Sequence, residues 1–187
     1  MNPSILVVSL LIFAFGGSVA FAQTDVSTFS EVNELAFMQG TWVGEGWMMG
    51  RQRQRMPFQQ TEVIQPKVSE QALMIDGLGY ALDSTGQVTD RVIHDAFGVI
   101  SLNPETGAVT MLSFSEANGR MECAFHRLDE KKLYWEFKDP RSGGTIRFTE
   151  DFSTEGEWKE IGEISMDGER WFQFFEMNLK RESEVRD

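Results

Sequence analysis

The sequence predicts an all-β protein: a single antiparallel up-and-down barrel of about ten strands, preceded by a short helical turn. Apolar and polar residues alternate with a period of two from residue 41 onward. Turn signals such as Asn118-Gly119 and Asp167-Gly168 separate the alternating segments, and both pairs favour tight hairpins. No long helical pattern lies between the segments, so consecutive strands are expected to be neighbours in a closed meander.

A helix-start signal at Ser30, followed by Leu35 and Met38 at helical spacing, predicts the helical turn, which Gly40 ends. The domain is expected to span residues 35–182. Its expected strands cover residues 41–49, 59–65, 71–82, 91–102, 108–115, 120–128, 132–138, 145–152, 157–166 and 169–180.

The first 22 residues have the pattern of a secretory signal peptide. Residues 5–15 are apolar and uncharged, and Ala20-Phe21-Ala22 provides the small-residue cleavage site. The apolar run is too short to span a bilayer. We therefore expect cleavage after Ala22, export to the periplasm or the medium, and no membrane span afterwards. Residues 23–34 are expected to form an N-terminal arm.

The charge and the cysteine count exclude several classes of function. A formal net charge of −12 and a pI near 4.6 argue against binding to nucleic acid or to an anionic membrane. Cys123 is the single cysteine, so no disulfide within the chain and no cysteine-rich metal site is expected. A buried, inert thiol is the expectation for Cys123, and no metal site is predicted.

The apolar faces of the expected strands carry several polar residues. Glu150, Glu160 and Gln173 alternate in phase with Trp, Phe and Met side chains. A carboxylate inside a barrel must find a partner or lose its charge. Such residues indicate a lined cavity, or else positions near an open end of the barrel.

Four segments together resemble a known superfamily. They are residues 37–47, which contain Gly40-Thr41-Trp42, and residues 75–79, 158–163 and 171–177. Their order resembles the calycin superfamily of lipocalins and fatty-acid-binding proteins, and more specifically a bacterial lipocalin-like family. The resemblance implies structural roles for Gly40 and Trp42 at the closed end of the barrel. It also implies that Arg181, from the last strand, stacks on the Trp42 ring.

The haem-binding nitrobindins are similar as well, with a ten-strand barrel and a Gly-x-Trp-x-Gly start. In that family a histidine late in the chain holds the haem. Here no histidine follows His126, so the resemblance does not extend to haem, and no cofactor is expected.

The leading hypothesis is a barrel that binds a small, mostly apolar molecule in its interior without catalysis, so that no catalytic residue is assigned. One alternative is a lyase or isomerase that uses Glu150 or Glu160 with His94. Another is a filled barrel that binds other proteins through an apolar patch at Phe172 and Phe174. The expected ligand-binding residues are Trp47, Met74, His94, Phe114, Trp135, Phe148, Glu150, Trp158 and Trp171.

Overall fold

A computed structural model describes residues 27–116 and 119–182, and shows the all-β up-and-down barrel that the sequence predicts. The expected signal peptide lies outside the described residues. A short 3-10 helix precedes ten strands. The elements are η1 (Val32–Met38), β1 (Gly40–Met49), β2 (Arg55–Lys67), β3 (Ala72–Leu82), β4 (Val88–Asn103), β5 (Ala108–Ser115), β6 (Gly119–Asp129), β7 (Lys132–Lys138), β8 (Thr145–Asp151), β9 (Glu157–Ser165) and β10 (Phe172–Arg181).

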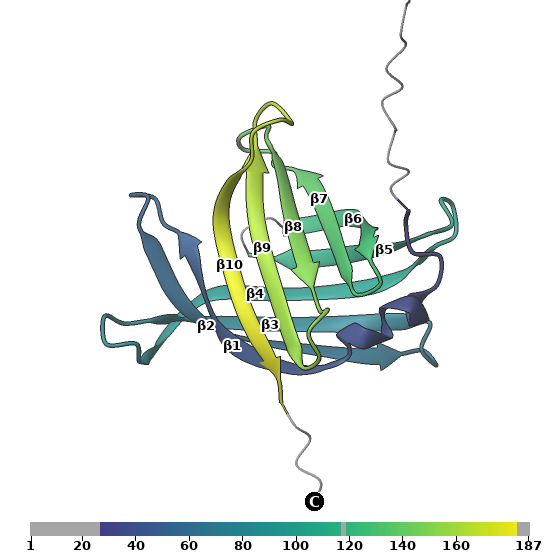
Figure 1. Ribbon diagram of the computed structural model, residues 1–187, viewed down its shortest axis with the longest axis horizontal. Coiled ribbons are helices and arrows are strands. Elements are labelled where there is room, and N and C mark those ends of the chain that lie inside the picture. The colour runs from purple at the N-terminus through teal and green to yellow at the C-terminus, as the bar shows by residue number, and fades with distance from the viewer. Residues whose placement is uncertain (1–26, 117–118, 183–187) are drawn as a thin grey trace, which may run out of the picture.

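Each strand pairs antiparallel with its neighbours in sequence, and β1 pairs with β10 to close the barrel. Closure pairs every strand with a neighbour on each side, although the first half of β4 has no partner on β5. In Figure 1 the front wall, β8 to β10, crosses steeply over the rear wall formed by β3 and β4. Among the described residues, no helix is long and apolar enough to cross a membrane.

The closing seam requires two glycines on β1. Gly44 pairs with Leu179 and Gly46 with Met177 on β10. A Cβ atom at Gly44 would lie 2.1 Å from the Asn178 carbonyl oxygen, and one at Gly46 would lie 2.3 Å from that of Glu176. Both distances are far inside van der Waals contact, so only glycine lets the first strand approach the last.

The meander gives the barrel two distinct ends. We call one end the base. It holds η1, the end of β10 and the turns β2–β3, β4–β5, β6–β7 and β8–β9. We call the other end the mouth. It holds the turns β1–β2, β3–β4, β5–β6, β7–β8 and β9–β10.

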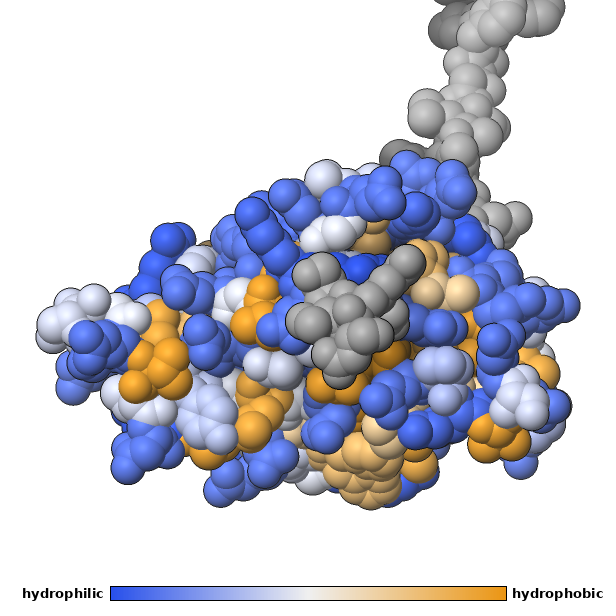
Figure 2. All heavy atoms as spheres, turned by 90° about the horizontal axis from the view of Figure 1, so that it is seen from below, coloured by the Kyte–Doolittle hydropathy of each residue, from blue (hydrophilic) through white to orange (hydrophobic). Residues whose placement is uncertain are grey.

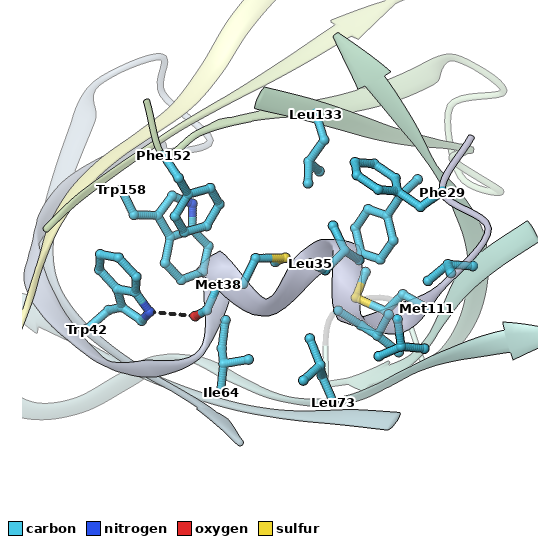
Figure 3. Close-up of a cluster of buried hydrophobic side chains, with 14 of the residues drawn as sticks. Phe29, Leu35, Met38, Trp42, Ile64, Leu73, Met111, Leu133, Phe152 and Trp158 are labelled. Carbon is cyan, nitrogen blue, oxygen red and sulfur yellow. Dashed lines mark hydrogen bonds between the residues drawn. The ribbon is translucent and has the colours of Figure 1, made fainter. Parts of the chain in front are cut away.

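The base is filled by η1, which crosses it beneath the strands (Figure 3). Leu35 and Met38 are fully buried in one continuous apolar cluster. The helix start is capped by Glu34, whose Oε1 accepts hydrogen bonds from the backbone N–H groups of Ser30 and Glu31, at 2.9 and 3.0 Å.

Residues 27–34, expected to be part of an N-terminal arm, pack into the base. Phe29 is fully buried, and its carbonyl accepts a hydrogen bond from the Val109 N–H at 2.8 Å. The guanidinium of Arg127 lies 4.1 Å from the centre of the Phe29 ring. The segment is mostly polar, so its sequence does not predict that Phe29 is buried.

Trp42 and Arg181 lock the base. The guanidinium of Arg181 lies 4.3 Å from the centre of the Trp42 ring, and its Nη2 donates to the Phe37 carbonyl at 2.8 Å. The indole N–H of Trp42 donates to the Met38 carbonyl at 2.8 Å (Figure 3). Gly40 has a φ of +133°, and a Cβ there would lie 3.0 Å from Arg181 Nη1. The Gly-x-Trp motif therefore joins η1, β1 and β10 at one point.

Replacing Arg181 with Ala should lower the free energy of unfolding by roughly 1–3 kcal/mol. The change removes a cation–π contact and hydrogen bonds to backbone carbonyls of η1. Urea unfolding of the variant measures this loss. Lys180→Ala, at an exposed position on the same strand, is the matched control; equal effects of the two changes would contradict the role assigned to Arg181.

Candidate functional site

Inward-facing side chains change character along the barrel axis. Near the base they are apolar and buried, as Ile64, Leu73 and Leu133 show. Halfway up lies a layer of buried polar groups. Toward the mouth the inward side chains are only half-buried, among them Met48, Ala81 and Phe175. The base is thus packed solid, whereas the mouth half is accessible to solvent.

Strand β2 supplies two of the buried polar residues. Gln60 and Glu62 are 2% and 7% exposed and share the inward face with Phe58 and Ile64. Gln60 Nε2 donates a hydrogen bond to Glu62 Oε1 at 2.8 Å. Neither residue is among the expected ligand-binding residues. The signal was present, because Phe58 and Ile64 alternate in phase with them.

Glycines on β3 make room for these side chains. Glu62 pairs with Gly77, and Gln60 with Gly79. A Cβ at Gly77 would lie 2.6 Å from the Glu62 carboxyl oxygens, and one at Gly79 would lie 2.2 Å from Gln60 Oε1. The polar side chains of β2 therefore lie across the bare backbone of β3.

Glu150 on β8 and Glu160 on β9 are direct cross-strand partners. They are 4% and 7% exposed, and their Cβ atoms are expected to lie about 5 Å apart. Trp135 Nε1 donates to Glu150 Oε1 at 2.6 Å. Glu150 Oε2 is buried without a hydrogen-bond partner. We call Glu62, Glu150 and Glu160 the carboxyl layer.

Burial governs the ionisation of the carboxyl layer. It raises the pKa of Glu62 to about 8, against the opposing hydrogen bond from Gln60, and that of Glu150 to about 7, against the bond from Trp135. Burial also raises the pKa of Glu160 well above its usual value, and repulsion from the other two carboxylates raises it further. Protons are therefore retained in this layer near neutral pH.

His94 lies between the carboxyl layer and the mouth. An irregularity in the β3–β4 pairing brings Ile93 and His94 to the interior together. His94 Nε2 lies 3.9 Å from Glu62 Oε1, beyond hydrogen-bond distance, and 38% of its side chain is exposed. Burial lowers the pKa of His94, although Asp95 opposes this shift. Near pH 7 the pair is therefore a neutral imidazole beside a protonated carboxyl group.

A cleft of about 160 Å³ opens at the mouth, between the ends of β1 to β4. A cavity of about 150 Å³ holds a benzene-sized molecule. Arg55 borders this cleft and stacks on Trp47, with its guanidinium 3.8 Å from the ring centre. The cleft is lined by Met48, Arg55, Met56, Pro57, Ala81, Leu82, Arg91 and Ile93.

Aromatic rings line the wall above the carboxyl layer. Trp135 stacks on Phe148 with ring centres 4.5 Å apart, and Phe148 meets Phe175 edge-on at 5.7 Å. Phe175 in turn stacks on Phe58 at 5.5 Å. A continuous aromatic surface therefore extends from β7 around to β2.

Five of the nine expected ligand-binding residues face the interior: His94, Trp135, Phe148, Glu150 and Trp158. Trp158 lies lower than the others, in the packed base, with its ring centre 5.9 Å from that of Trp42. Of the remaining four, His94 lies near Glu62, and Trp135 contacts both Phe148 and Glu150.

The other four expected residues lie on the outer face. Trp47 alternates with the inward Gly46 and Met48, and Met74 with the inward Leu73 and Ile75. These strands carry large apolar side chains on both faces, so the alternation of apolar residues did not show which face is inward. Phe114 is 44% exposed and borders a shallow depression on the outer surface, and Trp171 stacks under Arg147.

An irregularity in β10 also changes the facing of two residues. The β9–β10 register shifts between Gln173 and Phe175. Gln173, expected to face inward, is exposed and hydrogen-bonds Glu176. Phe174 is half-buried, with its ring 5.7 Å from that of Phe148, so it does not form a surface patch with the exposed Phe172. The outer face visible in Figure 2 is mainly hydrophilic, with apolar residues in separate patches.

Two further expectations concern chemistry. Cys123 is buried, and burial together with the Glu150 and Glu122 carboxylates raises the pKa of its thiol to about 12. Across residues 27–116 and 119–182, no group of three or more His, Cys, Asp or Glu side chains could hold a metal ion. The carboxylate in contact range of His94 is that of Glu62, and not that of Glu150 or Glu160.

Stability should fall as the pH rises from about 4.5 to 8. The unfolded chain releases the Glu62 proton near 4.5, whereas the folded chain retains it until the raised pKa of about 8. Folding therefore binds a proton in this window, and unfolding becomes easier by up to about 1.4 kcal/mol per pH unit for each such carboxyl. Thermal unfolding at several pH values measures the slope. Glu62→Gln should flatten it, whereas the control Glu45→Gln, at an exposed site on β1, should not; a slope unchanged by Glu62→Gln would refute this origin.

Comparison with known proteins finds similarity in fold but not in sequence. No protein-family model matches the chain, and no curated protein matches it. Among solved structures, the crystal structure of Rv2717c from M. tuberculosis is similar, with a TM-score of 0.60 and 11% sequence identity. The match covers 84% of this chain and all of that one. The protein thus shares its overall fold with this structure.

Proposed function

We propose that the protein is an exported, calycin-like barrel that binds a small molecule with a mostly apolar body in its mouth half, without converting it chemically. The aromatic wall of Trp135, Phe148 and Phe175 would contact the body of the ligand. The carboxyl layer would form the floor of the site, and the cleft at the mouth its entrance.

The observation that carries this proposal is the gradient of burial along the barrel axis. Side chains on the same inward face are fully buried at the base, where η1 fills the interior. They are half-buried toward the mouth, although they are aromatic or aliphatic. Large apolar side chains left partly exposed inside a barrel offer a contact surface to an apolar ligand.

Export is the part of the proposal that rests on residues 1–22 alone. If the segment acts as a signal peptide, the mature chain begins at Gln23 and functions in the periplasm or the medium. With a single cysteine, the exported chain could form no internal disulfide. The apolar cluster at the base would then have to stabilise the fold by itself.

Blocking the mouth should abolish uptake of an apolar probe. Ala81 faces the cleft, whereas Leu78 lies on the outer face of the same strand. Fluorescence titration with the neutral dye N-phenyl-1-naphthylamine should show saturable binding to the wild-type protein. We expect Ala81→Trp to weaken this binding roughly tenfold or more by filling the cleft, and Leu78→Trp to leave it unchanged. Equal dye binding by the two variants would contradict a site in the mouth half.

The pairing of His94 with Glu62 favours a second candidate, an enzyme that uses general acid–base chemistry. The two groups lie 3.9 Å apart, and their pKa values are shifted in opposite directions. Near pH 7 one holds a proton and the other can accept one, which is the complement that proton transfer requires.

Base-catalysed ring opening of 5-nitrobenzisoxazole tests this candidate without knowledge of a natural substrate. A base removes the ring C–H proton, the N–O bond breaks, and a cyanophenolate is released. If His94 is a competent base, the wild-type protein should accelerate the reaction, and His94→Ala should reduce the acceleration roughly tenfold or more. His126→Ala is the matched control. The same rate in the wild type and in His94→Ala would rule this chemistry out at the site.

A further inference from the structure

We propose that the carboxyl layer binds the positively charged nitrogen of an amine ligand, whose apolar body lies against the aromatic wall above it. This inference rests on the proposed function and adds the chemical class of the ligand. It is carried by the arrangement of Glu62, Glu150 and Glu160 and by the partners that these side chains lack.

The three carboxyl groups belong to one region of the interior. Glu150 and Glu160 are cross-strand partners, and both face inward. Glu62 approaches them from β2, across the seam where β10 pairs with β1. The Glu160 carboxyl senses the charges of both other groups, which places all three within electrostatic range of one another.

Hydrogen bonding in the layer is incomplete. Trp135 occupies one oxygen of Glu150 and Gln60 one oxygen of Glu62. Glu150 Oε2 is buried and has no partner. Among the described residues, none donates a hydrogen bond to the Glu160 carboxyl group. A buried acceptor without a donor costs roughly 1–3 kcal/mol, and a ligand N–H group would supply the donor.

No basic side chain neutralises the layer from within. In the described part of the chain, no lysine or arginine forms an ion pair with any of the three glutamates; the basic side chain within 4 Å of the layer is His94, whose Nε2 lies 3.9 Å from Glu62 Oε1. Arg181 and Arg127 point inward at the base, but they are committed to Trp42, Phe29 and backbone carbonyls there. A ligand cation that displaces the protons of the layer would supply the positive charge that these side chains lack.

The surroundings suit an organic cation. The glutamates do not form a group that could hold a metal ion, whereas a substituted ammonium group can reach carboxyl oxygens that are farther apart. Gly77 and Gly79 allow the Glu62 and Gln60 side chains to lie flat against the backbone of β3. Trp135, Phe148 and Phe175 face the same space and can contact either the apolar body or the cation itself. The net charge of −12 favours the approach of a cation.

Two probes of equal shape and different charge test the inference. At pH 7, 1-naphthylmethylamine is cationic, whereas 1-naphthalenemethanol is neutral. Isothermal titration calorimetry with the full mature chain should show that the amine binds roughly tenfold more tightly or better, because a charge-assisted hydrogen bond replaces a neutral one. Glu150→Gln and Glu160→Gln should each remove most of this preference, because each weakens binding of the amine more than binding of the alcohol. Glu45→Gln, on the outer face of β1, is the control and should keep the preference.

The outcomes separate the two proposals. If both probes bind equally well to the wild-type protein, the mouth half binds ligands but the cation subsite is refuted. If the amine is preferred and the preference survives both glutamine variants, the carboxyl layer is likewise refuted as its source. If neither probe binds, the proposed function itself fails. A variant that does not fold leaves the wild-type comparison decisive, because that comparison needs no substitution.

Discussion

The structure depends on the close approach of its first and last strands. β1 and β10 can pair only because Gly44 and Gly46 have no side chain to meet the β10 carbonyl oxygens. Trp42 and Arg181 then fasten the seam at the base, where η1 supplies the carbonyl groups that both side chains bind. Closure in turn creates an interior with two ends, one filled by η1 and one left accessible.

The same closure determines the chemistry of the interior. A polar side chain on the inward face of an open sheet could reach water around the edge, but inside a closed barrel it must be satisfied locally. Glu62 and Glu150 obtain one hydrogen bond each, from Gln60 and Trp135. Burial then raises the pKa values of these carboxyl groups instead of leaving stable charges. The layer can therefore bind a proton or a ligand cation, but it is not a rigid ion-pair network.

The base and the mouth half thus serve separate purposes. The apolar cluster around Leu35, Met38 and Trp42 stabilises the fold and leaves no space for a ligand. The mouth half carries the half-buried rings, the carboxyl layer and His94. Its inward side chains are less fully buried than those of the base. Because η1 and the buried Phe29 stabilise the closed end, the other end can keep a surface that is not optimised for stability.

The sequence by itself determined the barrel and the order of its strands, because these follow from local periodicity and turn chemistry. The stacking of Arg181 on Trp42 was implied by the resemblance to the calycins. Only the tertiary structure decided which side chains meet. Trp47 and Met74 lie on strands that are apolar on both faces, so periodicity could not choose their side. Register irregularities reversed the facing of Gln173 and brought Ile93 inward beside His94. Glu62 lies within electrostatic range of Glu150 and Glu160, across a seam between strands far apart in the chain, and no local sequence pattern contains that proximity.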